Sequence, residues 1–281
     1  MTTITHDPVR THWQAAARGE PLDWGALATE PDGIGEQVVV DPAGLWLRPR
    51  GAVPGPVVLA VHGGGFVSGS VRTHRRMFGH LARAAGVPVF VVEYGLVPEH
   101  VFPSQVGAVT AAYEWLLAGG SGPVAVAGDS CGATLALGVA LRARDEGATP
   151  PSSLLLMSAW TDLLATGESY GSGTDPFFTR DLVRGLGTAY LAGADPCDPL
   201  ASPVHADLRG LPPTYLQVGA EEALLDDSRL LADRMRAAGV DVRLDELPGQ
   251  VHTSQMAAGR TEVADDAIGR AGTWLRSTLV P

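Results

Sequence analysis

The chain has 281 residues, of which 45% are hydrophobic and 18% charged, a composition typical of a globular protein with one or two domains. Its formal net charge of −11 argues against binding to nucleic acid, because an acidic surface repels phosphate groups. No apolar run approaches the roughly 18 residues of a membrane span, and we expect no secretory signal from the first residues. Two cysteines are too few for a zinc cluster or a disulfide framework. This use of cysteine is typical of a reducing compartment, so we expect a cytoplasmic protein.

From about residue 56 onward, short apolar runs alternate with longer helical patterns. Residues 34–49 are compatible with an antiparallel pair of strands, and the alternating pattern of 240–246 is typical of a strand at a sheet edge. Near-continuous apolar runs predict buried strands over 56–61, 87–92, 124–127, 153–157 and 214–218.

Helical patterns occupy the intervals between these strands. They cover 73–85, 104–118, 131–146, 226–238 and 261–279, and the glycines suited to a C-terminal cap are Gly86, Gly119, Gly147 and Gly239. The alternation of strands and helices predicts an α/β fold in one domain over residues 1–281. Its sheet should be mostly parallel, with helices on both faces.

Two segments break this alternation. Residues 1–30 carry Trp13 and Trp24 without the pattern of a strand, and residues 160–210 contain one predicted helix, at about 180–192. Long insertions between strands are usually functional. We therefore predict that the two segments pack together as a small helical cap over one end of the sheet.

A G-x-S-x-G element lies directly between the strand at 124–127 and the helix at 131–146. It reads Gly128-Asp-Ser-Cys-Gly132, and this strand–turn–helix context is the one that a nucleophilic serine requires. The sharp turn exposes the side chain of Ser130, and the helix that follows points free N–H groups at the same place. The pattern predicts Ser130 as a nucleophile.

A run of glycines, His62-Gly-Gly-Gly-Phe66, follows the strand at 56–61. Consecutive glycines after a strand allow backbone N–H groups to approach a ligand closely, and this arrangement supplies oxyanion-hole donors in lipases and esterases. The predicted donors are the N–H groups of Gly64, Gly65 and Cys131. The thiol of Cys131 itself is expected to be buried packing.

A serine nucleophile needs a base and a carboxylate that orients the base. Of the eight histidines, His252 is the one that follows the last predicted strand, where sites form in open α/β sheets. The acid should follow the strand at 214–218. Physical reasoning leaves four candidates open there, Glu221, Glu222, Asp226 and Asp227.

Taken together, the motifs from about residue 38 to the C-terminus resemble those of the hormone-sensitive-lipase-like branch of the α/β-hydrolases, a group of bacterial esterases. The resemblance rests on several ordered motifs. Besides the two glycine motifs above, they are Tyr94-Gly-Leu-Val-Pro-Glu-His100, Trp160-Thr-Asp162, Asp198-Pro-Leu-Ala-Ser-Pro203, Leu211-Pro-Pro-Thr214, Gly219-Ala-Glu-Glu-Ala-Leu-Leu-Asp-Asp-Ser228 and Pro248-Gly-Gln-Val-His252.

This resemblance implies an α/β-hydrolase fold with an eight-stranded, mostly parallel sheet. It places the acid about thirty residues before the histidine, which selects Glu222 and leaves Asp226 as the second choice. The chain departs from the family in having Cys131 after the serine, where alanine is usual, and Gly95 where arginine is usual. The expected triad is Ser130, His252 and Glu222.

The activity implied is hydrolysis of small esters or lactones through an acyl-enzyme on Ser130, without a cofactor or a metal ion. Trp160, Phe177 and Phe178 are candidate walls of the substrate pocket, together with the tryptophans of the first segment. Two alternatives remain open. One is an acyltransferase or ring-opening or ring-closing enzyme with the same triad, and the other is a ligand receptor without catalysis. The edge strand is compatible with a homodimer.

Overall fold

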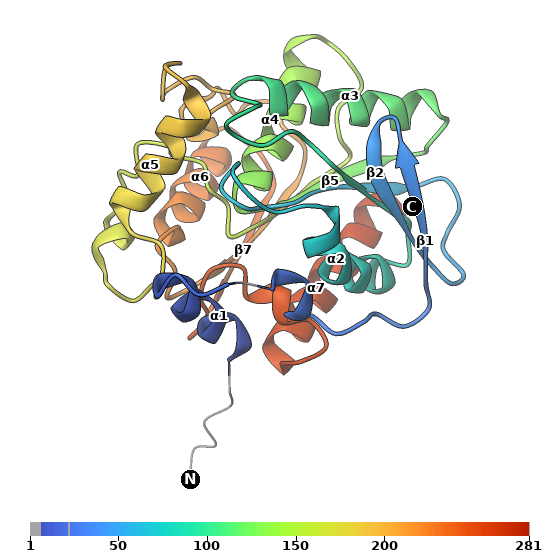
Figure 1. The fold of residues 1–281 in the computed structure, drawn as a ribbon. Coiled ribbons are helices and arrows are strands. Elements are labelled where there is room, and N and C mark those ends of the chain that lie inside the picture. The colour runs from blue at the N-terminus through green and yellow to red at the C-terminus, as the bar shows by residue number, and fades with distance from the viewer. Residues whose placement is uncertain (1–6, 22, 281) are drawn as a thin grey trace.

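The computed structural model describes residues 7–21 and 23–280, and its centre is a twisted sheet (Figure 1). Within these residues the sheet has eight strands in the order β1-β2-β4-β3-β5-β6-β7-β8. Strand β2 pairs antiparallel with β1 and β4, and the pairs from β4 to β8 are all parallel. The bounds are β1 Ile34–Val40, β2 Ala43–Pro49, β3 Val57–Val61, β4 Val89–Val92, β5 Val124–Asp129, β6 Leu154–Met157, β7 Thr214–Gly219 and β8 Val242–Leu247.

Helices cover both faces of the sheet, as the sequence predicts. Alternate residues of the strands face opposite ways, so Val58 and Ala60 pack on one side while Leu59 and Val61 pack on the other. Helices α2 and α7 cover the first side, and α3, α4 and α6 cover the second. The bounds are α1 Pro8–Ala17, α2 Val71–Ala85, α3 Ser104–Ala118, α4 Cys131–Asp145, α5 Arg180–Leu191, α6 Leu225–Ala237 and α7 Glu262–Leu279.

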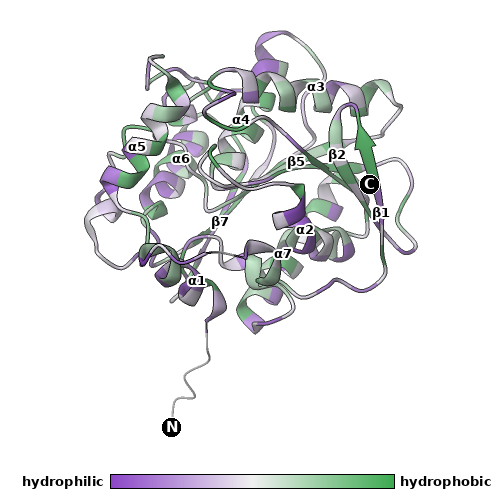
Figure 2. Ribbon diagram, in the orientation of Figure 1, coloured by the Kyte–Doolittle hydropathy of each residue, from purple (hydrophilic) through white to green (hydrophobic). Residues whose placement is uncertain are grey.

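The colouring by hydropathy shows why these elements form (Figure 2). Strand β3 is apolar along its whole length and β5 is apolar as far as Ala127, because both faces of the sheet are covered. The helices carry both hydrophobic and hydrophilic residues. Helix α2 begins at a capping box made by Ser70 and Thr73 and ends at Gly86, whose φ is 68°. Helix α3 ends at the predicted cap, Gly119, and the residue after it, Gly120, has a φ of 75°.

The two segments predicted to form a cap contact each other. The ring of Trp13 in α1 stacks on Phe177 at 5.4 Å and meets the edge of Phe178 at 4.9 Å between ring centres. The beginning of the second segment packs elsewhere, since the backbone N–H groups of Thr161 and Asp162 donate to Asp227 of α6. The contacts with α1 therefore come from the middle of the segment, just before α5. No helix among the described residues has the length and apolar character needed to cross a membrane.

Candidate active site

Ser130 lies on the tight turn between β5 and α4, with φ 52° and ψ −124°. A side chain on either flanking glycine would clash with backbone. A Cβ at Gly128 would lie 2.3 Å from the carbonyl oxygen of Gly132, and one at Gly132 would lie 2.2 Å from that of Val61. These short distances explain why both positions are glycine. A larger residue at either position would push the turn that carries Ser130 away from β3 or from the start of α4.

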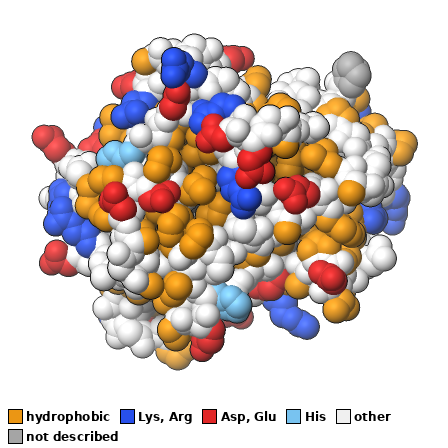
Figure 3. All heavy atoms as spheres, turned by 90° about the horizontal axis from the view of Figure 1, so that it is seen from above, with side chains coloured by type: hydrophobic (Ala, Val, Ile, Leu, Met, Phe, Trp, Pro, Cys, Tyr) orange, Lys and Arg blue, Asp and Glu red, His pale blue; other side chains and the backbone are white. Residues whose placement is uncertain are grey.

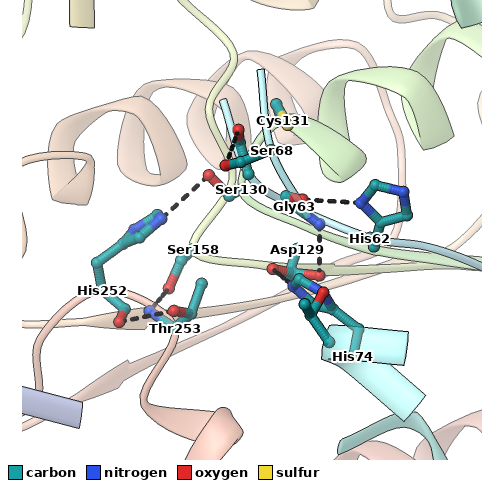
Figure 4. Close-up of polar contacts among 12 residues, drawn as sticks. His62, Gly63, Ser68, His74, Asp129, Ser130, Cys131, Ser158, His252 and Thr253 are labelled. Atoms are coloured by element: carbon teal, nitrogen blue, oxygen red, sulfur yellow. Dashed lines mark hydrogen bonds and ion pairs between the residues drawn. The ribbon is translucent and has the colours of Figure 1, made fainter. Parts of the chain in front are cut away.

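His252 lies beside Ser130, although 122 positions separate them in the sequence (Figure 4). The distance between His252 Nε2 and Ser130 Oγ is 3.0 Å, within hydrogen-bond range. The histidine is 1% exposed and follows β8, so it approaches from the C-terminal end of the parallel strands. Its carbonyl oxygen accepts a 2.8 Å hydrogen bond from the indole N–H of Trp13, which connects the loop to α1.

The other nitrogen of the imidazole faces Glu222. The distance from His252 Nδ1 to Glu222 Oε2 is 3.7 Å, longer than a hydrogen bond but within ion-pair range. Both groups are buried, and Nδ1 and Oε1 have no hydrogen-bond partner among the described residues. Glu222 is thus the carboxylate that lies against the histidine.

The other three acidic residues of this loop have different partners. Glu221 forms an ion pair with Arg10 at 2.6 Å. Asp226, the second choice for the acid, accepts the backbone N–H of Ser169 at 2.9 Å. Asp227 accepts three hydrogen bonds on α6, from the N–H groups of Thr161 and Asp162 and from the hydroxyl of Tyr170. Of the four, the structure brings Glu222 to His252.

The glycine loop after β3 passes close to Ser130. Gly64 and Gly65 have φ values of 124° and 62°, and the Gly63 N–H donates to Asp129 Oδ1 at 3.0 Å. Among the described residues, the N–H groups of Gly64 and Cys131 have no backbone acceptor, whereas the N–H of Gly65 also contacts the sulfur of Cys131. The N–H groups of Gly64 and Cys131 can therefore bind a ligand that reaches Ser130.

The side chain of Cys131 does not face that ligand position. It is fully buried, and its sulfur accepts the backbone N–H of Phe66 at 3.3 Å. Burial raises the pKa of the Cys131 thiol to about 12, so the thiol stays protonated and is a poor nucleophile. The group of Cys131 that a ligand at Ser130 can reach is therefore its backbone N–H and not its thiol.

A cavity of about 250 Å³ opens above Ser130. Some of the residues that line it were predicted from the sequence as walls of the substrate pocket, and others were not. Phe177 and Phe178 line it, as do both tryptophans of the first segment. The complete lining consists of Trp13, Trp24, Gly64, Gly65, Val67, Ser68, Asp129, Ser130, Phe177, Phe178, Leu182, Leu186, His252 and Thr253.

Trp160 does not line this cavity, so the prediction that it forms a pocket wall is wrong. Its backbone N–H donates to the carbonyl of Ser130 at 3.2 Å, but the residue is 2% exposed and its ring packs against Phe66 with 5.5 Å between ring centres. The ring thus belongs to the hydrophobic core next to the site. Among the described residues, no group of three or more histidines, cysteines or carboxylates is arranged to hold a metal ion.

Sequence reasoning missed two kinds of residue here. Leu182 and Leu186 of α5 lie four positions apart, so a helical pattern shows that they share a face. The pattern does not show that this face meets the cavity. Ser158, which contacts Glu222 and the loop of His252, is a single serine after a strand, and the sequence carries no signal for it.

Comparison with known proteins places the chain in a family. Residues 58–256 match the family model described as alpha/beta hydrolase fold. An acetyl-hydrolase of Streptomyces hygroscopicus is 39% identical over 236 residues, covering 83% of this chain and 79% of the relative. An esterase of Acinetobacter venetianus is 38% identical over 205 residues, covering 71% and 68%.

Solved structures agree over nearly the whole chain. An esterase from the bacterial hormone-sensitive lipase family is 38% identical, with a TM-score of 0.86, covering 99% of this chain and 94% of that one. A hormone-sensitive lipase from a metagenome library is 30% identical, with a TM-score of 0.90, covering 99% and 100%. The chain therefore belongs to the α/β-hydrolase family, in the branch of the bacterial hormone-sensitive-lipase-like proteins.

Proposed function

We propose that this protein is a serine hydrolase that cleaves carboxylic esters through an acyl-enzyme on Ser130. The observation that carries the proposal is the 3.0 Å contact between Ser130 Oγ and His252 Nε2 at the base of an apolar cavity. A serine hydroxyl becomes nucleophilic when an adjacent imidazole accepts its proton. The curated relatives named acetyl-hydrolase and esterase support the same chemistry.

In this mechanism Ser130 Oγ attacks the ester carbonyl while His252 Nε2 takes the hydroxyl proton. The negative charge that develops on the carbonyl oxygen is stabilised by the N–H groups of Gly64, Gly65 and Cys131. Each such donor contributes on the order of 3 kcal/mol to the lowering of the barrier. Glu222 faces Nδ1, where it orients the imidazole and stabilises its protonated form.

The second half of the cycle reverses these proton transfers. The imidazolium of His252 gives its proton to the departing alcohol, and the acyl group remains on Ser130 as an ester. A water molecule then attacks the acyl-enzyme while His252 accepts its proton, and the acid product leaves with Ser130 restored. Every proton moved in this cycle passes through Nε2.

The cavity favours small, uncharged substrates. Aromatic and aliphatic side chains form most of its described lining, and no arginine is among them, so a substrate carboxylate would find no cation there. Short-chain esters and small lactones fit both the size and the polarity of this site.

A panel of p-nitrophenyl esters from acetate to octanoate tests the proposal on the wild type and on Ser130→Ala. We expect hydrolysis by the wild type, with the highest kcat/KM for short acyl chains, and a loss of about 10⁴-fold or more in the variant. Ser153→Ala is a matched control, because this serine is also buried but lies at the N-terminal end of β6, away from the site, where it contacts Thr278. Hydrolysis by Ser130→Ala at the wild-type rate would remove Ser130 from the mechanism.

A further inference from the structure

Ser158 takes no part in the proton transfers described above, yet its hydroxyl contacts Glu222 and the backbone of Thr253, the residue that follows His252. It follows directly after β6, is 1% exposed, and has a φ of 48°. Its backbone N–H donates to the carbonyl of Gln217 on β7 at 2.7 Å. A left-handed backbone is uncommon for a residue other than glycine, and such conformations are concentrated at functional sites.

The hydroxyl of Ser158 makes two hydrogen bonds whose directions are determined by chemistry. The backbone N–H of Thr253 can only donate, so Ser158 Oγ accepts it, at 2.9 Å (Figure 4). The hydroxyl therefore uses its single hydrogen for the second contact, to Glu222 Oε2 at 2.8 Å. A hydroxyl that donates to a carboxylate makes a charge-assisted bond, which is stronger than a neutral one.

These two bonds connect the acid to the base. Thr253 directly follows His252, and Oε2 of Glu222 is the same oxygen that lies 3.7 Å from His252 Nδ1. The N–H of Gly219 donates to this oxygen as well, at 3.3 Å. The Ser158 hydroxyl and the Gly219 N–H together hold Oε2 in front of the imidazole, while Oε1 has no partner among the described residues.

We infer that Ser158 is a positioning residue, which holds the carboxylate of Glu222 and the loop of His252 in register so that the imidazole points at Ser130. The inference rests on the proposed function and deepens it, because it adds a fourth side chain to the hydrolytic site. Without the hydroxyl, Oε2 loses a donor and the Thr253 N–H loses its acceptor. The carboxylate and the imidazole can then turn independently, and the chemical step slows while substrate binding persists.

Steady-state kinetics of Ser158→Ala with p-nitrophenyl acetate test this role. We expect kcat to fall about 10- to 100-fold, the effect typical of outer partners that orient a site, with KM changed less than about twofold. Ser153→Ala, at the other end of the same strand, controls for the general cost of removing a buried serine hydroxyl. It should keep kcat within about twofold of the wild type. Equal kcat values for Ser158→Ala and Ser153→Ala would overturn the inference.

A double-mutant cycle with Glu222→Gln distinguishes positioning from a structural effect. If Ser158 acts through Glu222, Ser158→Ala should lower kcat by less than about twofold once Glu222 has been replaced. Independent, multiplying losses would contradict the inference. Should Ser158→Ala fail to fold, Ser158→Gly removes the same hydroxyl and suits the positive φ better, so the same comparison applies.

The same measurements separate this inference from the proposed function. Wild-type hydrolysis that disappears in Ser130→Ala, together with full activity in Ser158→Ala, would refute the role of Ser158 alone. Absence of hydrolysis by the wild type, or full activity of Ser130→Ala, would refute both.

Discussion

At the scale of single residues, Glu222 and Asp226, which both follow β7, have different contacts although they are close in the sequence. Glu222 faces the imidazole of His252, whereas Asp226 accepts a backbone N–H from Ser169 and forms an ion pair with Arg229 at 3.4 Å. The two acids are four positions apart, with Glu222 in the loop before α6 and Asp226 in its first turn, but their side chains contact different parts of the molecule. The family resemblance favours Glu222 by its spacing to His252, and the contacts in three dimensions show the physical difference between the two acids.

Replacing each acid by its amide tests the assignment. Glu222→Gln should lower kcat for p-nitrophenyl acetate by about 10²- to 10⁴-fold with little change in KM, because the amide cannot stabilise the imidazolium. Asp226→Asn is the matched control and should keep kcat within about threefold, since it lies outside the site. The reverse pattern, with activity lost in Asp226→Asn and kept in Glu222→Gln, would show that the acid has been misassigned.

Asp227 gives the protein a pH dependence of stability. Burial raises the pKa of Asp227 to about 7, despite the hydrogen bonds from Thr161 and Asp162 that favour its charged form. Between about pH 4 and pH 7, the folded chain holds a proton on Asp227 that the unfolded chain has released. The free energy of unfolding should therefore fall as pH rises through this window, by up to about 1.4 kcal/mol per unit from this group.

Urea denaturation of the wild type and of Asp227→Asn at intervals from pH 4.5 to 6.5 measures this contribution. The amide stays neutral, its oxygen can accept the same two backbone N–H groups, and its NH₂ can donate to the hydroxyl of Tyr170. Relative to the wild type, the variant should gain about 1 kcal/mol of unfolding free energy per pH unit. Parallel curves for the two proteins would show that Asp227 does not titrate in this range.

At the scale of elements, local pattern predicts much of the architecture. Apolar runs predict the parallel strands β3 to β7, and the alternating pattern of 240–246 predicts β8. The strand predicted over 87–92 begins two residues late because Pro88 has no N–H to pair. The turn at Ser130 was predictable because glycine at two positions is a strict local requirement. Trp160 was misplaced because a large aromatic residue near a site suits a core as well as a pocket, and the choice depends on how distant elements dock.

Helix α1 is an example of an element, distant in the sequence, that packs directly against the site. Trp13 donates its indole N–H to the His252 carbonyl and packs against Phe177 and Phe178, although 239 positions separate the donor from the acceptor. The helix is also held by the ion pair between Arg10 and Glu221. The first segment thus contributes one wall of the cavity and supports the loop of the base.

Two substitutions of Trp13 separate these roles. Trp13→Phe keeps a ring but removes one of the two donors to the His252 carbonyl, the other being the Thr253 hydroxyl at 2.8 Å. The free energy of unfolding should therefore fall by about 1 kcal/mol. Trp13→Ala should cost about 3–5 kcal/mol and widen the cavity, so the preferred p-nitrophenyl ester should become longer. Trp115→Ala on α3, which is 37% exposed and outside the lining, should leave the chain-length preference unchanged. An unchanged preference in Trp13→Ala would remove this wall from the substrate site.

At the scale of the whole molecule, three distant segments converge at one end of the sheet. Ser130 comes from the turn after β5, Glu222 from the loop after β7 and His252 from the loop after β8, so the parallel sheet itself brings them together. On the face shown in Figure 3, acidic and basic side chains are interspersed, with hydrophobic side chains between them. The excess of negative charge does not gather there into one continuous acidic surface.

Trapping the acyl-enzyme tests the central claim most directly. The wild type and Ser130→Ala are mixed with p-nitrophenyl acetate, quenched in acid within milliseconds, digested and mapped by mass spectrometry. The account predicts one acetyl group per chain, on the peptide that contains Ser130, and none on the corresponding peptide of the variant. An acetyl group found on another residue at the wild-type rate of turnover, or an equal label in Ser130→Ala, would contradict it.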